Sequence, residues 1–119
     1  NPLMRYNLGL LLYRKGDYKE ALEEFNKSKR AWDDIKVSLC EAQTLIRLGQ
    51  YEDALTLFKN AAEKDTNYFY LYKHMGIIYE IYVGDMKKAY EYYNIYLSMV
   101  KEDKDAESWI QIVKTRLAR

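Results

Sequence analysis

The residues most capable of chemistry in this sequence are its only cysteine, Cys40, and its only histidine, His74. A thiol and an imidazole can act as nucleophile and base when a third group orients the base. No orienting carboxylate is evident for either residue, so packing or groove lining is the favoured interpretation of both. One cysteine allows neither an intrachain disulfide nor a cysteine-based zinc site, and one histidine allows no histidine pair for a metal.

Adjacent acidic residues are the remaining candidates for acid–base chemistry. Among them are the pairs Glu23/Glu24, Asp33/Asp34 and Glu102/Asp103. They fall on faces or ends of expected helices, where solvation and capping explain them better than catalysis does. Each glycine is expected to end a helix or to let two helices approach, so no phosphate-binding loop is indicated. We therefore predict no enzyme activity, no catalytic residue, no metal and no cofactor.

Composition and charge limit the classes of partner. The chain has 119 residues, 49% of them apolar, with 19 basic and 18 acidic residues and a net charge of +1. This balance provides no field for steering nucleic acid or an anionic membrane surface. No apolar run of about 18 residues is present, so no membrane insertion is predicted. The 13 tyrosines suit both half-buried packing and a binding surface.

The cellular location is left unknown by the sequence. A lone cysteine fits a reducing compartment, which slightly favours the cytoplasm without establishing it. The first residue is Asn1 rather than Met. We therefore expect a fragment or a processed form of a longer protein.

A repeat of 33 to 35 residues runs through the whole chain. Residues 9–25 match residues 42–58 at a constant spacing of 33, and residues 76–93 form a third copy. The three copies share a glycine, a small residue and an aromatic residue at matched positions. These are Gly16, Gly49 and Gly84, then Ala21, Ala54 and Ala89, then Phe25, Phe58 and Tyr93. The third copy has one extra residue between Gly76 and Gly84, which predicts a bulged or extended helix end near 81–83.

Each copy is predicted to be a helical hairpin. Leu8, Leu11 and Leu12 form a helical stripe in the first copy. The shared glycine ends the first helix, and Asp17 and Asp85 are candidate N-caps of the second. The shared alanine and aromatic residue lie one turn apart, so they predict a close helix contact with a large side chain filling the space beside it.

This pattern resembles the tetratricopeptide repeat (TPR) family over essentially the whole chain. The resemblance implies an all-α fold, an α-α superhelix or solenoid of three helix hairpins plus a C-terminal helix. Glu41 departs from the pattern, since the family usually has Leu there. We expect a single TPR domain over 1–119, with repeats at 2–34, 35–67 and 68–103. Residues 104–119 are either a capping helix or a truncated fourth repeat. The expected helices are 3–15, 18–32, 35–48, 51–64, 68–83, 86–102 and 105–118.

The resemblance also implies a concave binding groove lined by the first helix of each hairpin. Carried over by family position, the predicted groove residues are Tyr6, Leu10, Tyr13, Leu39, Gln43, Tyr70, Lys73, His74 and Ile77, and Cys40 shares this face. Chaperone-binding members of the family clamp a partner's terminal carboxylate with Lys, Asn and Arg. Here the clamp positions hold Tyr6, Leu10, Cys40, Tyr70 and His74. An aromatic and apolar groove therefore predicts a protein or peptide partner held mainly by apolar contact.

Two other functions remain open. The array could be structural, associating with itself or with further repeats through its ends. It could also be the regulatory arm of a larger enzyme or sensor. The leading prediction is a protein-interaction scaffold that binds a peptide or helix of a partner whose identity the sequence does not give.

Overall fold

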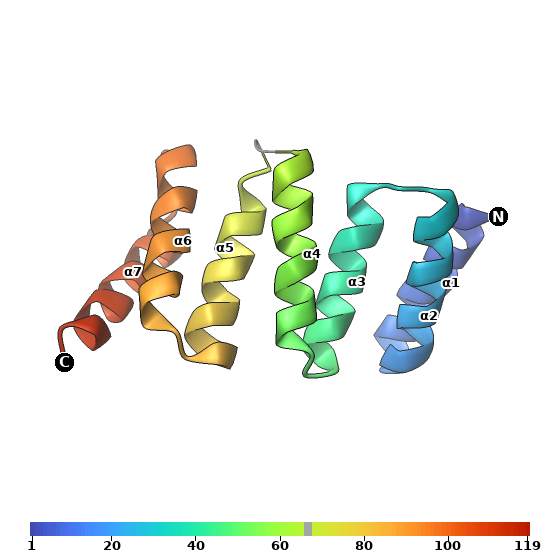
Figure 1. Ribbon diagram of the computed structural model, residues 1–119, viewed down its shortest axis with the longest axis horizontal. Coiled ribbons are helices and arrows are strands. Elements are labelled where there is room, and N and C mark those ends of the chain that lie inside the picture. The colour runs from blue at the N-terminus through green and yellow to red at the C-terminus, as the bar shows by residue number, and fades with distance from the viewer. Residues whose placement is uncertain (66–67) are drawn as a thin grey trace. The chain divides into compact units, whose positions relative to one another are not determined.

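The computed structural model describes residues 1–65 and 68–119. Within these ranges the chain is all-α, and none of the described residues forms a strand. The elements are α1 (Pro2–Lys15), α2 (Tyr18–Ala31), α3 (Ile35–Arg47), α4 (Tyr51–Lys64), α5 (Tyr70–Ile77), the π-helical segment η1 (Ile78–Val83), α6 (Met86–Met99) and α7 (Lys104–Leu117). The predicted all-α repeat of helix hairpins is thereby confirmed (Figure 1). Among the described helices, none is long and apolar enough to cross a membrane.

The chain divides into two compact units, Asn1–Ala61 and Ala62–Arg119. The division falls inside α4, so it does not follow the predicted repeat boundaries. The single-domain organisation and the repeat bounds remain predictions. Residue 67, the predicted end of the second repeat, lies outside the described residues.

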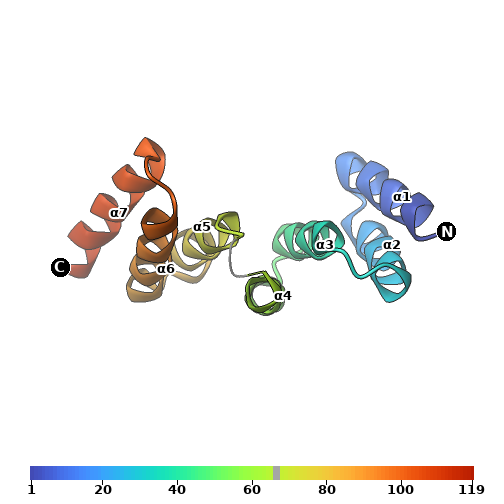
Figure 2. The ribbon, with the colours of Figure 1, turned by 90° about the horizontal axis from the view of Figure 1, so that it is seen from above.

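The core of the first unit lies where α1, α2 and α3 meet (Figure 2). Ala21, Phe25 and Val37 are fully buried there, which confirms the predicted burial of the shared alanine and aromatic residue on α2. A Cβ atom added at Gly9 of α1 would lie 2.6 Å from the Phe25 ring. Glycine at this position therefore lets α1 approach the aromatic side chain of α2 closely. The second-copy counterparts of the α2 pair, Ala54 and Phe58, are also fully buried.

Glycine ends the first helix of every hairpin, as predicted. Gly16, Gly49 and Gly84 have φ values of 88°, 78° and 81°, in the left-handed region that other residues rarely adopt. At the start of the second helix, the Asp85 carboxylate accepts a hydrogen bond from the Lys88 N–H at 3.1 Å, which confirms the predicted cap. Asp17 occupies the same position before α2, but its side chain accepts no capping hydrogen bond.

The extra residue of the third copy is accommodated as a π-helix. In the first two hairpins the Asp17 and Gln50 N–H groups bond to carbonyl groups five residues earlier, those of Leu12 and Leu45. In the third, the Asp85 N–H reaches six residues back to the Tyr79 carbonyl. The insertion therefore widens the last turns over Ile78–Val83, and the predicted distortion is confirmed.

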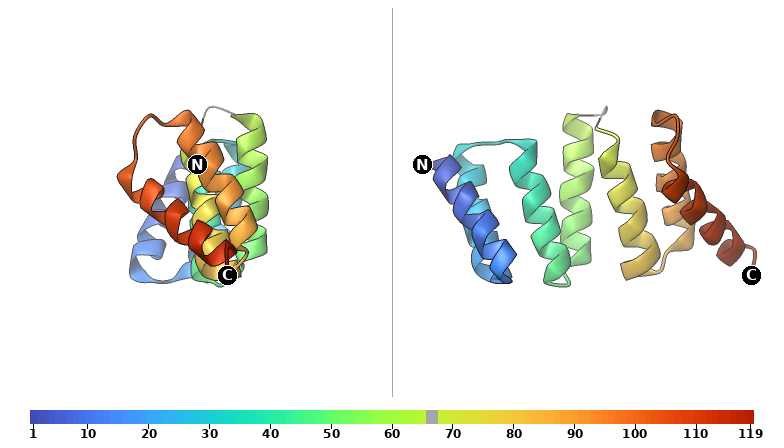
Figure 3. Two further views of the ribbon diagram at one scale, coloured as in Figure 1. Left: turned by 90° about the vertical axis from the view of Figure 1, so that its left-hand side faces the viewer. Right: turned by 180° about the vertical axis from the view of Figure 1, so that it is seen from behind.

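The second unit packs α6 between the α5–η1 segment and α7 (Figure 3). Ala89 and Tyr93 of α6 are fully buried, and α7 contributes Ala106, Ile110 and Val113 to the core. Gly76 repeats the arrangement seen at Gly9, because an added Cβ would lie 2.5 Å from the Tyr93 ring. The helix predicted over 86–102 ends earlier, at Met99, since Val100 is extended.

Candidate functional site

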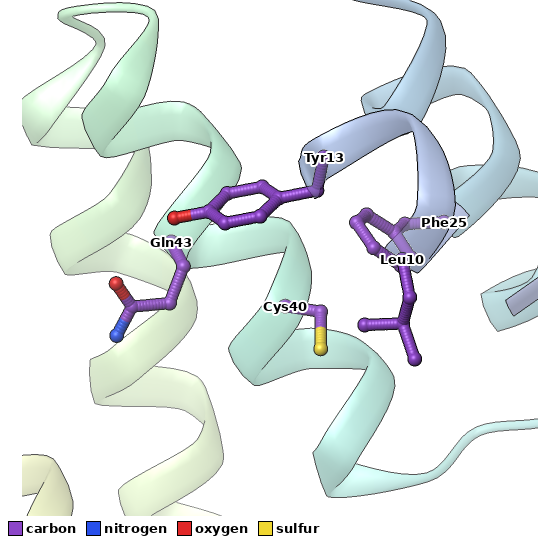
Figure 4. Close-up of a pocket in the computed structure, with 5 residues that line it drawn as sticks. All are labelled: Leu10, Tyr13, Phe25, Cys40 and Gln43. Carbon is purple, nitrogen blue, oxygen red and sulfur yellow. The ribbon is translucent and has the colours of Figure 1, made fainter. Parts of the chain in front are cut away.

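A cavity of about 150 Å³ lies in the first unit. Its lining consists of Leu10, Tyr13, Phe25, Cys40 and Gln43 (Figure 4). Leu10 and Tyr13 reach from α1 toward Cys40 and Gln43 of α3, and Phe25 of α2 completes the lining. We call this space the α1–α3 cavity. Its volume is similar to that of an apolar cavity that holds one benzene molecule.

The hairpin geometry explains why these side chains meet. Leu10 and Tyr13 are three residues apart on α1, and Cys40 and Gln43 are three apart on α3, so each pair shares one helix face. Tyr13 is held in place at both ends. Its ring packs edge-on against Tyr18 at 5.3 Å, and its hydroxyl accepts a hydrogen bond from Arg47 Nε at 3.1 Å.

The thiol in the cavity wall is uncharged at physiological pH. Burial raises the pKa of Cys40, and the thiolate is the reactive form of cysteine. The Cys40 thiol donates a long hydrogen bond, 3.7 Å, to the Tyr6 hydroxyl. Burial raises the pKa of Tyr6 to about 12, and the hydrogen bond with Cys40 adds to this rise. The arrangement offers apolar surface to a ligand rather than a nucleophile.

The other groove residues predicted in the first unit have different surroundings. Tyr6 lies between aromatic neighbours, with ring centroids 6.1 Å from Phe25 and 5.8 Å from Trp32. Its side chain therefore contributes to packing as well as to the surface. Leu39 is half-buried on α3, beside Cys40 in sequence but outside the cavity lining. The structure brings Leu10, Tyr13 and Gln43 together, whereas Tyr6 and Leu39 lie outside that group.

The groove residues predicted in the second unit lie along α5 and differ in their surroundings. Tyr70 is exposed and packs against Phe69 at 4.6 Å between ring centroids. Ile77 is half-buried at the end of α5. Burial lowers the pKa of His74, and the neighbouring Lys73 ammonium lowers it further. His74 is therefore a neutral imidazole at pH 7.

Lys73 is held inside the second unit. Its ammonium is 3.1 Å from Asp103 and lies over the rings of Tyr96 and Trp109, at 5.5 and 5.2 Å from their centroids. Asp103 also accepts hydrogen bonds from Tyr96 at 2.5 Å and from the Ala106 N–H at 3.1 Å, which caps α7. Sequence position alone assigned Lys73 to the groove. Its partner Asp103 is 30 residues away, and the repeat spacing gives no signal of that contact.

No cluster of three or more His, Cys, Asp or Glu side chains with metal-binding geometry occurs among residues 1–65 and 68–119. The acidic residues singled out in the sequence have structural partners in several cases. Glu24 pairs with Arg5 at 3.4 Å and with Lys27 at 3.9 Å. Asp34 accepts the Lys36 N–H at 2.8 Å and so caps α3.

The fold and its repeated glycine, alanine and aromatic contacts define a helical-repeat protein of the TPR type. The sequence model of the family described as "Anaphase-promoting complex, cyclosome, subunit 3" matches residues 1–75. The chain belongs to this family. No curated protein sequence matches the chain.

Solved structures give the same fold. The first TPR of Spaghetti (RPAP3), bound to an HSP90 peptide, has a TM-score of 0.86 at 18% identity, covering 99% of this chain and 94% of that chain. The second TPR domain of human RPAP3, in complex with an HSP70 peptide, has a TM-score of 0.79 at 18% identity, with coverage of 96% and 98%. The Yersinia enterocolitica type III secretion chaperone SycD, in complex with a peptide of the translocator YopD, has a TM-score of 0.85 at 16% identity, with coverage of 95% and 92%. At these identities the likeness shows the fold alone.

Proposed function

We propose that this chain is a protein-interaction module that binds a segment of a partner protein and takes one apolar side chain of that segment in the α1–α3 cavity. The observation that carries the proposal is the cavity itself, lined by Leu10, Tyr13, Phe25, Cys40 and Gln43. The peptides bound by structurally similar TPR domains, and the family's description as a subunit of a complex, support the interaction role.

The lining favours a particular kind of side chain. Four of its five residues present carbon or neutral sulfur, and the Cys40 thiol stays protonated because burial raises its pKa. A Leu, Met or Phe side chain would exchange water contact for apolar contact there, worth about 1.5–3 kcal/mol on full burial. The Gln43 amide at the rim can donate to or accept from a peptide backbone. We therefore propose an apolar anchor residue flanked by an extended or helical backbone.

The terminal-carboxylate clamp of chaperone-binding TPR domains is not part of this proposal. Two of its positions, Leu10 and Cys40, belong to the cavity wall here. A side chain of carbon and a neutral thiol offer no charge to a carboxylate. The partner segment is accordingly proposed to bind through an internal apolar residue rather than through its C-terminus.

The experiment selects ligands from a phage-displayed random-peptide library on the immobilised chain and measures synthetic peptides by calorimetry. Cys40→Leu fills the cavity and is expected to weaken binding at least about tenfold, because the anchor side chain loses its space. Cys40→Ser leaves the cavity open and should retain binding. Asn60→Leu, on the exposed face of α4, adds the same apolar side chain away from the cavity and should have no effect. Equal affinity for Cys40→Leu and the unaltered chain would refute the proposal.

A further inference from the structure

A second surface, separate from the cavity, lies on the opposite side of α1. Met4, Leu8 and Leu11 follow one another at helical spacing and are 69%, 44% and 56% exposed. Soluble proteins seldom leave such a stripe open without an interaction that covers it. We call it the α1 stripe. Of the three leucines with helical spacing in the sequence, Leu12 packs against the core of the first unit, whereas Leu8 and Leu11 are exposed.

The repeat itself indicates what the α1 stripe is built to contact. The residues equivalent to Met4, Leu8 and Leu11 lie 33 residues later in the second copy and 67 residues later in the third copy. All of those equivalents are buried, at 8% exposure or less: Val37, Glu41 and Thr44 in α3, and Leu71, Met75 and Ile78 in α5 and η1. The same three positions are therefore covered in two copies and open in one.

In the second copy the covering element is a helix, α2. Glu41 of α3 forms an ion pair with Lys29 of α2 at 3.3 Å, and Val37 packs with Phe25. Leu22 and Asn26 of α2 lie around the same surface hollow as Glu41. Leu22, Asn26 and Lys29 are spaced i, i+4 and i+7, so one face of α2 covers this part of α3. The α1 stripe has Leu8 where α3 has Glu41, so its complement needs an apolar residue where α2 has Lys29.

The covering helix could come from a second copy of this chain or from a partner protein, and the charge of α1 distinguishes between the two. The helix α1 carries Arg14 and Lys15, besides Arg5, which pairs with Glu24 of α2, and it carries no acidic residue. Lys15 continues the stripe after Leu11 at helical spacing. A second copy docked through the same stripe would bring two cationic helices together, which costs energy. A helix with acidic residues beside its apolar face would instead be attracted to the cationic residues of α1.

We propose that the α1 stripe docks an amphipathic helix of a partner protein that has three apolar residues at i, i+4 and i+7 and acidic residues beside them. The docked helix takes the place on α1 that α2 takes on α3. This inference does not depend on the α1–α3 cavity or on any ligand of that cavity.

The probe is a hydrocarbon-stapled peptide that copies α2, because an isolated helix of this length is marginal in water. It carries Asn26→Leu and Lys29→Leu to match the stripe, with Lys19→Glu and Arg30→Glu as the acidic flank. A second peptide keeps Lys19 and Arg30 and should bind the chain several-fold more weakly. Binding is followed by the methyl signals of the methionines. The Met4 signal should shift, and that of Met75, which is 1% exposed, should not.

Variants locate the site and separate the possible occupants. Leu8→Gln should weaken the acidic probe at least about tenfold, whereas Ile95→Gln, at a similarly exposed residue of α6, should leave it unchanged. Binding without a Met4 shift, or equal loss in both variants, overturns the proposal. Sedimentation velocity of the chain alone tests whether a second copy of the chain covers the stripe. A dimer that Leu8→Gln dissociates would assign the stripe to a second copy and also overturn it.

Discussion

Replacing Gly76 with alanine tests a close helix contact of the second unit. An alanine Cβ there would lie 2.5 Å from the Tyr93 ring, whereas carbon atoms in contact are normally about 3.5–4.0 Å apart. The ring has no room to move, because Tyr93 is fully buried and its hydroxyl donates to Glu80 at 2.8 Å. Overpacking of this kind costs about 1–3 kcal/mol. Alanine also favours the helix over glycine by about 1 kcal/mol, so we expect a net loss of about 0–2 kcal/mol.

The matching change in the first unit is expected to cost less. An alanine Cβ at Gly9 would lie 2.6 Å from the Phe25 ring, but that ring also borders the α1–α3 cavity. A small displacement of Phe25 into the cavity relieves the contact, so the gain in helix propensity offsets most of the cost. We expect Gly9→Ala to change the free energy of unfolding by less than about 1 kcal/mol. It should also weaken any peptide that uses the cavity.

The assay is urea denaturation followed by tryptophan fluorescence, since each unit contains one tryptophan, Trp32 in the first and Trp109 in the second. Replacing either with phenylalanine leaves a reporter for the other unit. Ala42 occupies the position of the second copy that matches Gly76, and it is fully buried. Ala42→Gly therefore measures how much an alanine at this position contributes to the free energy of unfolding where the neighbouring helix leaves room for it. A Gly76→Ala chain that is more stable by the full propensity gain of about 1 kcal/mol would show that Gly76 and Tyr93 are not in close contact.

Three further predictions follow from the packing, the electrostatics and the proposed site. Ala21→Leu should cost about 1–3 kcal/mol because Ala21 is fully buried, whereas Ala31→Leu at the exposed end of α2 should be nearly neutral in the same denaturation assay. Hydrogen bonds from Tyr96, the Ala106 N–H and Lys73 lower the pKa of Asp103 from 3.8 to about 2. The unfolded chain therefore binds the proton more readily, so this stabilisation is present above pH 3.8 and is lost as the pH falls through about 2. Asp103→Asn keeps a capping residue and should remove that part of the acid sensitivity reported by Trp109, and an unchanged profile would contradict the assignment. Finally, peptides selected through the α1–α3 cavity should change affinity less than about twofold between about 0.05 and 0.3 M NaCl, and a steep salt dependence in calorimetry would indicate ion pairs instead.

The repeat spacing was enough to predict the elements and their closest contacts. Glycine, alanine and an aromatic residue recur at fixed intervals because helix ends, close helix contacts and filled space each require one residue type. The single extra residue before Gly84 predicted a local distortion for the same reason, since a hairpin has a fixed number of residues between its close contact and its turn. The π-helix over Ile78–Val83 is the form that this distortion takes.

The contacts of the predicted groove residues were harder to predict because they depend on other elements. Lys73 occupies a family groove position, and its ammonium contacts Asp103, Tyr96 and Trp109 of the second unit. Those three residues belong to α6, α7 and the segment between them. A position in a repeat specifies the direction of a side chain from its own helix. It does not specify whether a neighbouring element has a charge or a ring in reach.

The α1 stripe also shows that a position in the repeat does not specify the neighbouring element. Here the neighbour is absent from the described structure, whereas Lys73 has additional partners. Met4, Val37 and Leu71 are equivalent and apolar, so the sequence assigns them one environment. Their exposures of 69%, 0% and 0% differ because burial depends on the element that packs against the helix. The sequence periodicity therefore identifies surfaces that are built for contact, and the structure shows that the α1 stripe is open. Leu8, an apolar residue at an exposed position of the stripe, allows this reasoning to be tested. If Leu8→Gln leaves the acidic helix probe bound as before, equivalence within the repeat does not imply equivalence of contact.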